Sequence, residues 1–223
     1  MVHVYRKIDR PTKELLESFR GVGSATVHEA AGRIGAVRSC IKPLAPGMKI
    51  LGPAITVKCF PMDNLMLHKA IEVAEPGDVI VADTGGHTEG GYWGDLMASS
   101  ALARKIGGLV IDGGVRDSED IIAMGFPIFS RGTCIRGTVK RNLGLVNHPI
   151  LLGDVTIEPG DLVVGDDDGV VIVPKGMIAD VAEGVKKRIA NEKEKRSALE
   201  TGIPGVKLNK LDKVLESLGM VEE

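Results

Sequence analysis

Aromatic side chains are scarce in this sequence. Its 223 residues include one Trp, two Tyr and four Phe, whereas glycine occurs 29 times. With so few aromatic rings the core has to be built mainly from aliphatic side chains, and the abundance of glycine indicates many tight turns. Both features favour a mixed α/β domain with short strands.

The sequence also lacks the marks of a secreted or membrane protein. Cys40, Cys59 and Cys134 form no CxxC pair and are odd in number, which fits reduced thiols in or near the core better than a disulfide scaffold. No run approaches the ~20 apolar residues of a membrane span, and residues 1–14 lack the apolar block of a signal peptide. We therefore expect a cytoplasmic protein with no membrane partner.

Neither charge nor motif points to nucleic acid or nucleotides. The 28 basic residues nearly balance the 30 acidic ones, giving a net charge of -2, so no electrostatic footprint for a polyanion is present. The glycine-dense segment 83–95 has neither the GxGxxG nor the GxxxxGK[ST] spacing. The acidic segment 166–169 lacks the remaining ligands of a calcium loop, and a turn between two strands explains it.

Hydrophobic spacing predicts a single α/β catalytic domain over residues 1–175 and a helical extension over 176–223. In the extension, apolar residues at 178, 181, 185 and 189 form one stripe of a long charged helix that ends near Thr201, and a short helix follows. A helix of this kind often packs on another subunit. In the domain we expect helices over 11–20, 24–32 and 63–75, a strand over 53–60, and two turn-to-strand segments that repeat the pattern EPGD, at 75–81 and 158–164.

The stretch from Gly94 to Asp120 organises the rest of the chain. It reads as a helix opened by Gly94-Asp95, a buried strand over 109–111, a turn at Gly113-Gly114 and a second helix that starts near Arg116-Asp117. Two helix starts and the carboxyl end of a strand are thereby brought together, which is where open α/β sheets place their ligands. We expect a site for a small anion there.

The residue types in this stretch suggest metal-assisted chemistry on a 2-oxo acid. Asp117 and Asp120 are three positions apart, so on one helix face they offer Mg²⁺ or Mn²⁺ its preferred oxygen ligands. Arg116 adds a fixed positive charge for the oxygen of a pyruvate enolate, while the free amides of Leu96 and Met97 could hold the substrate carboxylate. The alternative is that the two acids only stabilise the start of a helix.

Asp95 is the remaining acid of the stretch and could move the proton, directly or through water. A structural carboxylate that caps its helix is the competing interpretation. No lysine is placed for a Schiff base, because Lys105 falls at the end of its helix, so a metal-enolate route is preferred. Outside the stretch, Asn64 could face the site, whereas His68 is interpreted as a core or interface histidine.

Read as a whole, the motif resembles that of a known family. Class II pyruvate aldolases, which cleave 4-hydroxy-4-methyl-2-oxoglutarate and 4-carboxy-4-hydroxy-2-oxoadipate, have the signature G-[DE]-x20-R-D-x2-[DE]. This chain resembles that signature, with Gly94-Asp95, then twenty residues, then Arg116-Asp117, then two residues and Asp120. The resemblance implies that pyruvate is a product and that the protein also decarboxylates oxaloacetate. It further implies that Asp117 holds a metal ion, which Asp120 reaches through water, and that residues 94–97 bind pyruvate together with Arg116.

The resemblance also implies a fold and an assembly. The fold would be a layered α/β/β core similar to the swivelling phosphohistidine domain, assembled as homotrimers or homohexamers. An acid from the tail of a neighbouring subunit would enter the site, and Glu192 is its counterpart by position, with Glu194 and Glu200 as alternatives. The same superfamily includes non-catalytic regulators of ribonuclease activity A, which is the alternative function.

Overall fold

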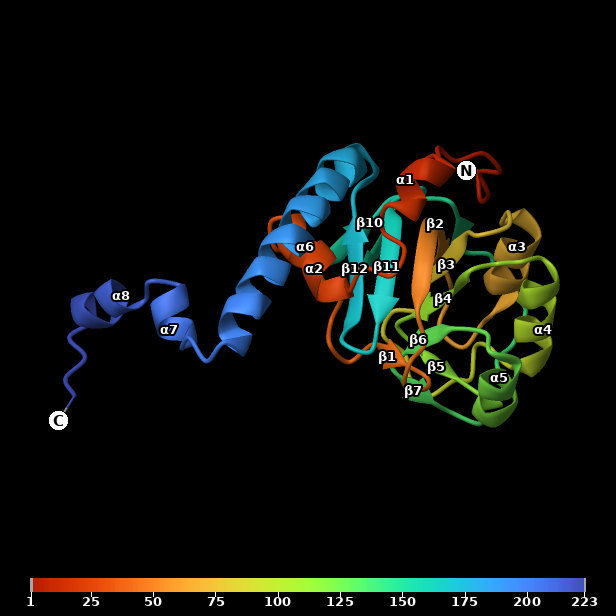
Figure 1. Cartoon of the computed structure of the whole chain (residues 1–223). Helices are drawn as coiled ribbons and strands as arrows, with labels where there is room; N and C mark the ends of the chain where they lie inside the picture. Colours follow the sequence, from red (N-terminus) through yellow and green to blue (C-terminus); the bar gives the residue numbers. More distant parts are fainter. Residues whose placement is uncertain (1, 223) are drawn as a thin grey trace.

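The computed structural model describes residues 2–222 as a mixed α/β body from which a helical extension projects (Figure 1). The main sheet has the order β1-β6-β4-β3-β2-β11-β12, and β8 pairs with β2. Neighbouring strands are parallel from β2 through β3 and β4 to β6, and β1, β8, β11 and β12 are antiparallel to their partners. The strands of this sheet are β1 (Lys42–Pro43), β2 (Ile50–Lys58), β3 (Val79–Asp83), β4 (Gly108–Ile111), β6 (Ile128–Ser130), β8 (Leu145–Val146), β11 (Leu162–Asp166) and β12 (Gly169–Val173).

Helices cover one face of the parallel strands. They are α3 (Leu65–Val73), α4 (Asp95–Ala103) and α5 (Ser118–Met124), and they lie together on one side of the sheet in Figure 1. Ile80 and Ala82 of β3 point into the core beneath them, together with Trp93, whose ring stacks on Phe126 with centroids 5.8 Å apart. Two short strands, β5 (Gly114–Val115) and β7 (Gly132–Thr133), pair beyond the edge of the main sheet.

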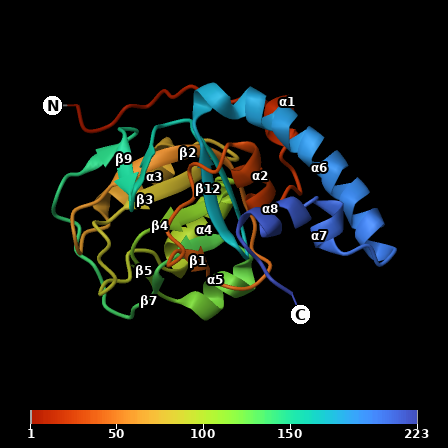
Figure 2. The same ribbon diagram turned by 90° about the vertical axis from the view of Figure 1, so that its left-hand side faces the viewer.

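The opposite face carries a second core. Val79 and Val81 of β3 point into it, in alternation with the residues that face the helices. The hairpin of β9 (Ile150–Leu152) and β10 (Val155–Ile157) lies over this side, as Figure 2 shows for β9. The two ends of the sheet also meet, because Lys42 Nζ donates to Asp168 O at 2.7 Å. The sheet is therefore nearly closed into a barrel.

A third core lies outside β11 and β12. It is formed with α1 (Lys13–Glu17), α2 (Ser24–Ala30) and the first turns of α6 (Ile178–Glu200), which follows the short 3₁₀ helix η1 (Lys175–Met177). The predicted stripe of α6 is confirmed at Ile178, Val181 and Val185, which are buried, whereas Ile189 is 47% exposed. The packed body thus includes the first turns of the predicted extension.

The remainder of α6 leaves the body and is followed by α7 (Gly205–Leu208) and α8 (Asp212–Ser217) (Figure 1). A mixed α/β fold with a C-terminal helical extension is confirmed. The likeness to the phosphohistidine domain and the functional division at residue 175 stay predictions. Within residues 2–222, no helix combines the length and the hydropathy needed to span a membrane.

The two EPGD segments are equivalent turns, as expected from the sequence. Asp78 Oδ2 accepts from the Glu75 amide at 2.7 Å, and Asp161 Oδ2 accepts from the Glu158 amide at 2.8 Å. Each aspartate therefore closes the turn that precedes its strand.

The start of α2 depends on a carboxylate from β11. The helix predicted over 24–32 begins at Ser24 and its N-cap is Gly23. Asp166 accepts from the Ser24 amide at 2.8 Å and from the Ser24 hydroxyl at 2.6 Å. Burial would raise the pKa of Asp166, but these hydrogen bonds outweigh it and lower the pKa below its ordinary 3.8.

We predict that Asp166→Asn lowers the free energy of unfolding by about 1–3 kcal/mol, because the variant leaves donors of α2 without their charged acceptor. Urea unfolding at neutral pH measures this loss. Since the folded pKa is lowered, the contribution of Asp166 is complete above 3.8 and is lost as the pH falls through the folded pKa. The control is Asp154→Asn, since Asp154 is exposed. Equal stability of the two variants at neutral pH would contradict the prediction.

Candidate functional site

The expected convergence of α4 and α5 is present. The Asp117 carboxylate accepts from the Asp95 amide, at 3.3 Å, and lies 3.3 Å from Arg116 Nε. The Arg116 amide donates in turn to Trp93 O at 2.8 Å. Arg116 and Asp117 thus join three segments: the start of α4, the end of the loop before it and the segment before α5.

Gly94 is needed for this approach. A Cβ built on Gly94 would clash with Asp117 Oδ2 and would lie 3.0 Å from Arg116 Nε. Any larger residue at position 94 would therefore push apart the two segments that form the site.

Asp117 itself has an unusual backbone conformation. It is the N-cap of α5 with a φ of 56°, in the left-handed region. This corrects the expectation that Asp117 and Asp120 occupy neighbouring turns of one helix, because only Asp120 is within α5. Aspartate tolerates the left-handed region better than most residues, and backbone strain of this kind is concentrated at functional sites. The predicted turn at Gly113-Gly114 is also shifted, since Gly114 belongs to β5.

Two adjoining cavities meet at Arg116. One, of about 260 Å³, is lined by Gly94, Asp95, Leu96, Met97 and Arg116 among others. The second, of about 270 Å³, is lined by Arg116, Asp117, Ser118, Thr133, Cys134 and Ile135. The structure therefore brings together all the predicted substrate-binding residues and places Asp117 beside them.

The two amides predicted to hold a carboxylate differ in their availability. The Met97 amide donates to Gly94 O at 3.1 Å, so it is occupied within the first turn of α4. No described residue accepts from the Leu96 amide, and the Leu96 side chain is 78% exposed. Of the expected pair, Leu96 is the amide that is free to bind a ligand.

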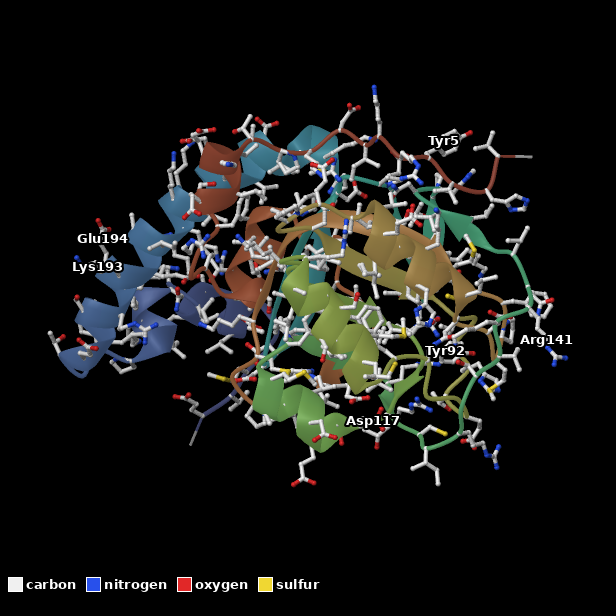
Figure 3. All side chains as sticks on the ribbon, turned by 90° about the vertical axis from the view of Figure 1, so that its right-hand side faces the viewer. Tyr5, Tyr92, Asp117, Arg141, Lys193 and Glu194 are labelled. Atoms are coloured by element: carbon white, nitrogen blue, oxygen red, sulfur yellow. The ribbon has the colours of Figure 1, made fainter. Side chains whose placement is uncertain are left out.

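Two predicted residues lie outside both cavities. Asp120 is exposed in the first turn of α5. Glu192 lies on the projecting part of α6, where it pairs with Arg188 at 2.7 Å. In Figure 3, the neighbouring Glu194 and Asp117 are far apart, so a tail acid cannot reach the site of its own chain.

Some residues of the site were not assigned to it from the sequence. Thr138 and Lys140 line the cavity beside Arg116. His68 lines it as well, and its side chain is exposed and does not lie in the core. Although His68 is exposed, the cavity wall partly desolvates its ring, and this desolvation together with the neighbouring Lys140 lowers its pKa. Asn64 does face the site; it is 6% exposed and its Oδ1 has no described hydrogen-bond partner.

The segment that carries Thr138 and Lys140 is held by Asp63. Its carboxylate accepts from the Arg141 amide at 2.7 Å and from the Asn142 amide at 2.8 Å, and its other oxygen accepts from Leu65 N at the start of α3. Burial tends to raise the pKa of Asp63, but these hydrogen bonds lower it overall. Asp63, which precedes the N-cap residue Asn64 of α3, therefore also fixes one wall of the site, a role that only the folded chain reveals.

A divalent metal requires oxygen ligands that are not already used. Within residues 2–222, no group of three or more His, Cys, Asp or Glu side chains is arranged to hold a metal ion. Mg²⁺ and Mn²⁺ need only one or two carboxylates when water and substrate complete the shell. Asp117 Oδ1 has no described hydrogen-bond partner, so this carboxylate fits such a role.

Several known proteins are similar to this chain. The RraA-like family model, described as aldolase/RraA, matches residues 24–172. A protein from Halalkalibacterium halodurans that carries a provisional name as 4-hydroxy-4-methyl-2-oxoglutarate aldolase is 37% identical, covering 87% of this chain and 92% of its own.

Two solved structures are similar in fold. An uncharacterized protein from Pseudomonas syringae has a TM-score of 0.81 at 30% identity, over 89% of this chain and 93% of its own. RraAS2 from Streptomyces coelicolor, described as an unusual member of a ribonuclease-inhibitor family, has a TM-score of 0.77 at 31% identity, over 85% of this chain and 99% of its own. The similarity thus extends to a protein named as an aldolase and to one assigned to an inhibitor family.

We predict that Gly94→Ala lowers the free energy of unfolding by about 1–3 kcal/mol, because the new methyl group overlaps Asp117 and Arg116. Urea denaturation measures the change. Gly176→Ala is the matched control, since a Cβ at position 176 has no atom within 4 Å. A Gly94 variant as stable as the control would show that the two segments can separate without cost.

Proposed function

The chain belongs to the RraA-like, aldolase/RraA family, and from this premise we propose that it is a divalent-metal-dependent class II pyruvate aldolase. It would cleave 4-hydroxy-2-oxo acids of the 4-hydroxy-4-methyl-2-oxoglutarate type to pyruvate and would decarboxylate oxaloacetate. One observation carries the proposal: Arg116 is fixed between the start of α4 and Asp117, at the junction of two cavities.

Arg116 supplies the charge that this reaction needs. Both reactions leave electrons on the 2-oxo oxygen as a carbon–carbon bond breaks, and a fixed guanidinium beside that oxygen lowers the energy of the resulting enolate. Arg116 lines both cavities, and its amide is anchored on Trp93 O. The free Leu96 amide at the start of α4 would hold the substrate carboxylate, with Gly94 and Met97 forming the adjacent wall.

Asp95 is proposed to transfer the proton. It lines the cavity with Arg116 and Leu96, and no described group donates a hydrogen bond to its carboxylate. A substrate hydroxyl or a water could therefore bind it directly. The competing role of Asp95 as a helix cap has no support, because the N-cap of α4 is Gly94 and the first amide of the helix, that of Asp95, donates to Asp117 instead.

Asp117 is proposed to hold Mg²⁺ or Mn²⁺, with Asp120 reaching the ion through water. When bound, the ion would supply a Lewis acid that polarises the oxygen atoms of the substrate. Arg116 would keep the Asp117 carboxylate in place from one side, which leaves Oδ1 for the ion.

The active unit is proposed to be a homotrimer or homohexamer in which Glu192 of one subunit completes the site of another. Within a single chain the projecting helix leaves apolar side chains exposed on α6 and in the segment after it, including Ile189, Leu199, Val206 and Leu218. Contact with a second copy would cover such side chains.

A non-catalytic regulator is the second candidate function. It is favoured by the similarity to RraAS2, which is described as belonging to a family of ribonuclease inhibitors. Such a protein would form a saturable complex with a ribonuclease and would show no metal-dependent turnover. The cytoplasmic location stays a prediction in both cases.

We predict that the wild-type protein converts oxaloacetate to pyruvate faster than Mg²⁺ alone and that Asp117→Asn lowers this rate on the order of 100-fold. Asparagine also tolerates the left-handed backbone of position 117, so the change removes charge with little added strain. A coupled lactate dehydrogenase assay follows pyruvate, and calorimetric titration with Mn²⁺ follows the loss of metal binding.

The matched control is Glu119→Gln, which removes an acid from the same first turn of α5. It should keep both the rate and the Mn²⁺ affinity. A wild-type rate equal to that of the metal alone would refute the enzymatic proposal and leave the regulator.

We predict that Glu192→Gln and Arg116→Gln are each impaired but recover activity when the two proteins are unfolded together and reassembled. Mixed oligomers would contain sites with an intact Arg116 from one chain and an intact Glu192 from another. Pyruvate production after mixing, with light scattering to count subunits, measures the effect. Full activity of a monomer would remove Glu192 from the site. So would a result in which Glu194→Gln, and not Glu192→Gln, is impaired and recovers activity on mixing with Arg116→Gln.

A further inference from the structure

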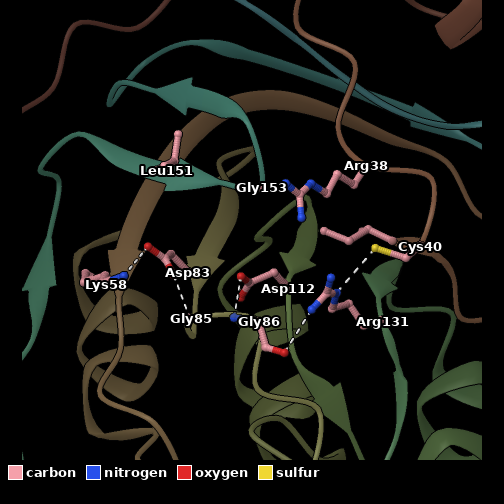
Figure 4. Close-up of a pocket in the computed structure, with 11 residues that line it drawn as sticks. Arg38, Cys40, Lys58, Asp83, Gly85, Gly86, Asp112, Arg131, Leu151 and Gly153 are labelled. Carbon is pink, nitrogen blue, oxygen red and sulfur yellow. Dashed lines mark hydrogen bonds and ion pairs between the residues drawn. The ribbon is translucent and has the colours of Figure 1, made fainter.

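A separate cavity of about 370 Å³ opens at the carboxyl ends of the parallel strands, and none of its lining residues lines the candidate site (Figure 4). Its floor consists of Lys58, Asp83, Asp112 and Arg131, each the last residue of a parallel strand or the one directly after it. The loop residue Arg38 and the β9–β10 hairpin border it from the other side.

The two carboxylates of this cavity are already engaged by the protein. Asp83 pairs with Lys58 and accepts from the Gly85 amide at 2.8 Å. Asp112 accepts from the Thr84 amide and hydroxyl, at 2.6 and 2.9 Å, and from the Gly86 amide at 2.8 Å. Every oxygen of the two acids has a donor, so they are not free to bind a metal ion.

The two arginines are not neutralised in the same way. Arg131 donates to Gly86 O at 2.9 Å and to Cys40 Sγ at 3.4 Å, both neutral partners, and its Nη2 has no described acceptor. Within residues 2–222, Arg38 contacts a single acidic side chain, that of Asp154, at 3.7 Å, and both side chains are more than half exposed. An exposed pair at that distance contributes little.

Two glycines make room for these arginines. A Cβ on Gly86 would lie 2.8 Å from Arg131 Nη1, and a Cβ on Gly153 would lie 3.0 Å from Arg38 Nε. Both glycines have positive φ values, 72° and 70°, which most side chains would resist. Because these two positions lack side chains, both guanidinium groups can lie at one cavity. Each guanidinium still has N–H groups without a described acceptor.

We propose that this cavity is a binding site for a small molecule that carries a carboxylate or phosphate group, held between Arg131 and Arg38. Arginine binds both oxyanions through paired N–H groups, and a guanidinium already fixed by other hydrogen bonds loses little freedom when it does so. The volume suits a small organic anion. The site is independent of the aldolase proposal, since it uses no residue of that site.

The test uses the full-length protein and two probes, inorganic phosphate and succinate, in separate calorimetric titrations. Arg131→Gln should weaken binding of the preferred probe by about tenfold or more, because a charge-assisted contact is lost. Arg136→Gln, which removes an exposed arginine paired with Glu89, is the matched control and should bind as the wild type does. Arg38→Gln should also weaken binding and provides a second variant at an exposed position.

Cys40 gives a readout at the cavity itself. Its thiol is exposed and contacts Arg131, so a bound anion should slow its alkylation by iodoacetamide, followed by peptide mass spectrometry. The slowing should occur in the wild type and in Arg116→Ala, and should be absent in Arg131→Gln. A preference for phosphate or for succinate identifies the group that the site takes. Failure of both probes to bind, unchanged affinity in Arg131→Gln, or loss of binding in Arg116→Ala would overturn the proposal.

Discussion

Burial of the parallel strands on both faces is the constraint on which the rest of the structure depends. In β3, Ile80 and Ala82 point toward the helices while Val79 and Val81 point into the second core. Such strands leave no face open to water, so charged groups are confined to their ends. Parallel order places all the carboxyl ends at one edge, and the three cavities described above lie in the loops that follow these ends.

The site is assembled by close contacts between segments that have little regular structure of their own. Gly94 allows Asp117 to approach the start of α4, and Asp117 keeps a left-handed conformation there. A strained residue persists only where its surroundings hold it in place. Trp93 directly precedes Gly94 in the sequence, and its buried ring stacks on Phe126. This stack supplies that rigid support.

Relatives of this chain carry names of two different kinds, one as an aldolase and one as a member of an inhibitor family, and a shared fold determines where a site is but not what it does. For this chain the difference would lie in a few groups: Arg116, the free oxygen of Asp117 and the carboxylate of Asp95. The cavity at Arg131 shows that the same edge of the sheet can hold a second, chemically different opening. The two are separated by the loop after β3, since Gly86 borders one and Gly91 the other.

The sequence alone determined most of the local elements and the stretch of chain around which the candidate site forms. Hydrophobic spacing predicted the strand at 53–60 and the helices at 24–32, 63–75 and 176–201, close to where they lie, and the spacing from Gly94 to Asp120 picked out the segments that meet. These are properties of short stretches, for which periodicity and capping are informative. It also predicted an apolar stripe on the extension, but the fold buries most of that stripe against the chain's own third core and not against another subunit.

Only the tertiary structure decided which distant side chains share a cavity. The sequence places His68 among apolar neighbours and predicts a core or interface histidine. In the structure it is exposed and lines one cavity with Thr138 and Lys140, whose segment Asp63 holds in place. Arg131 carries no motif, and its place beside Arg38 follows from the closure of the sheet and from two glycines far apart in the chain. Sequence patterns have no access to such contacts, because the segments that make them are joined by packing and not by proximity in the chain.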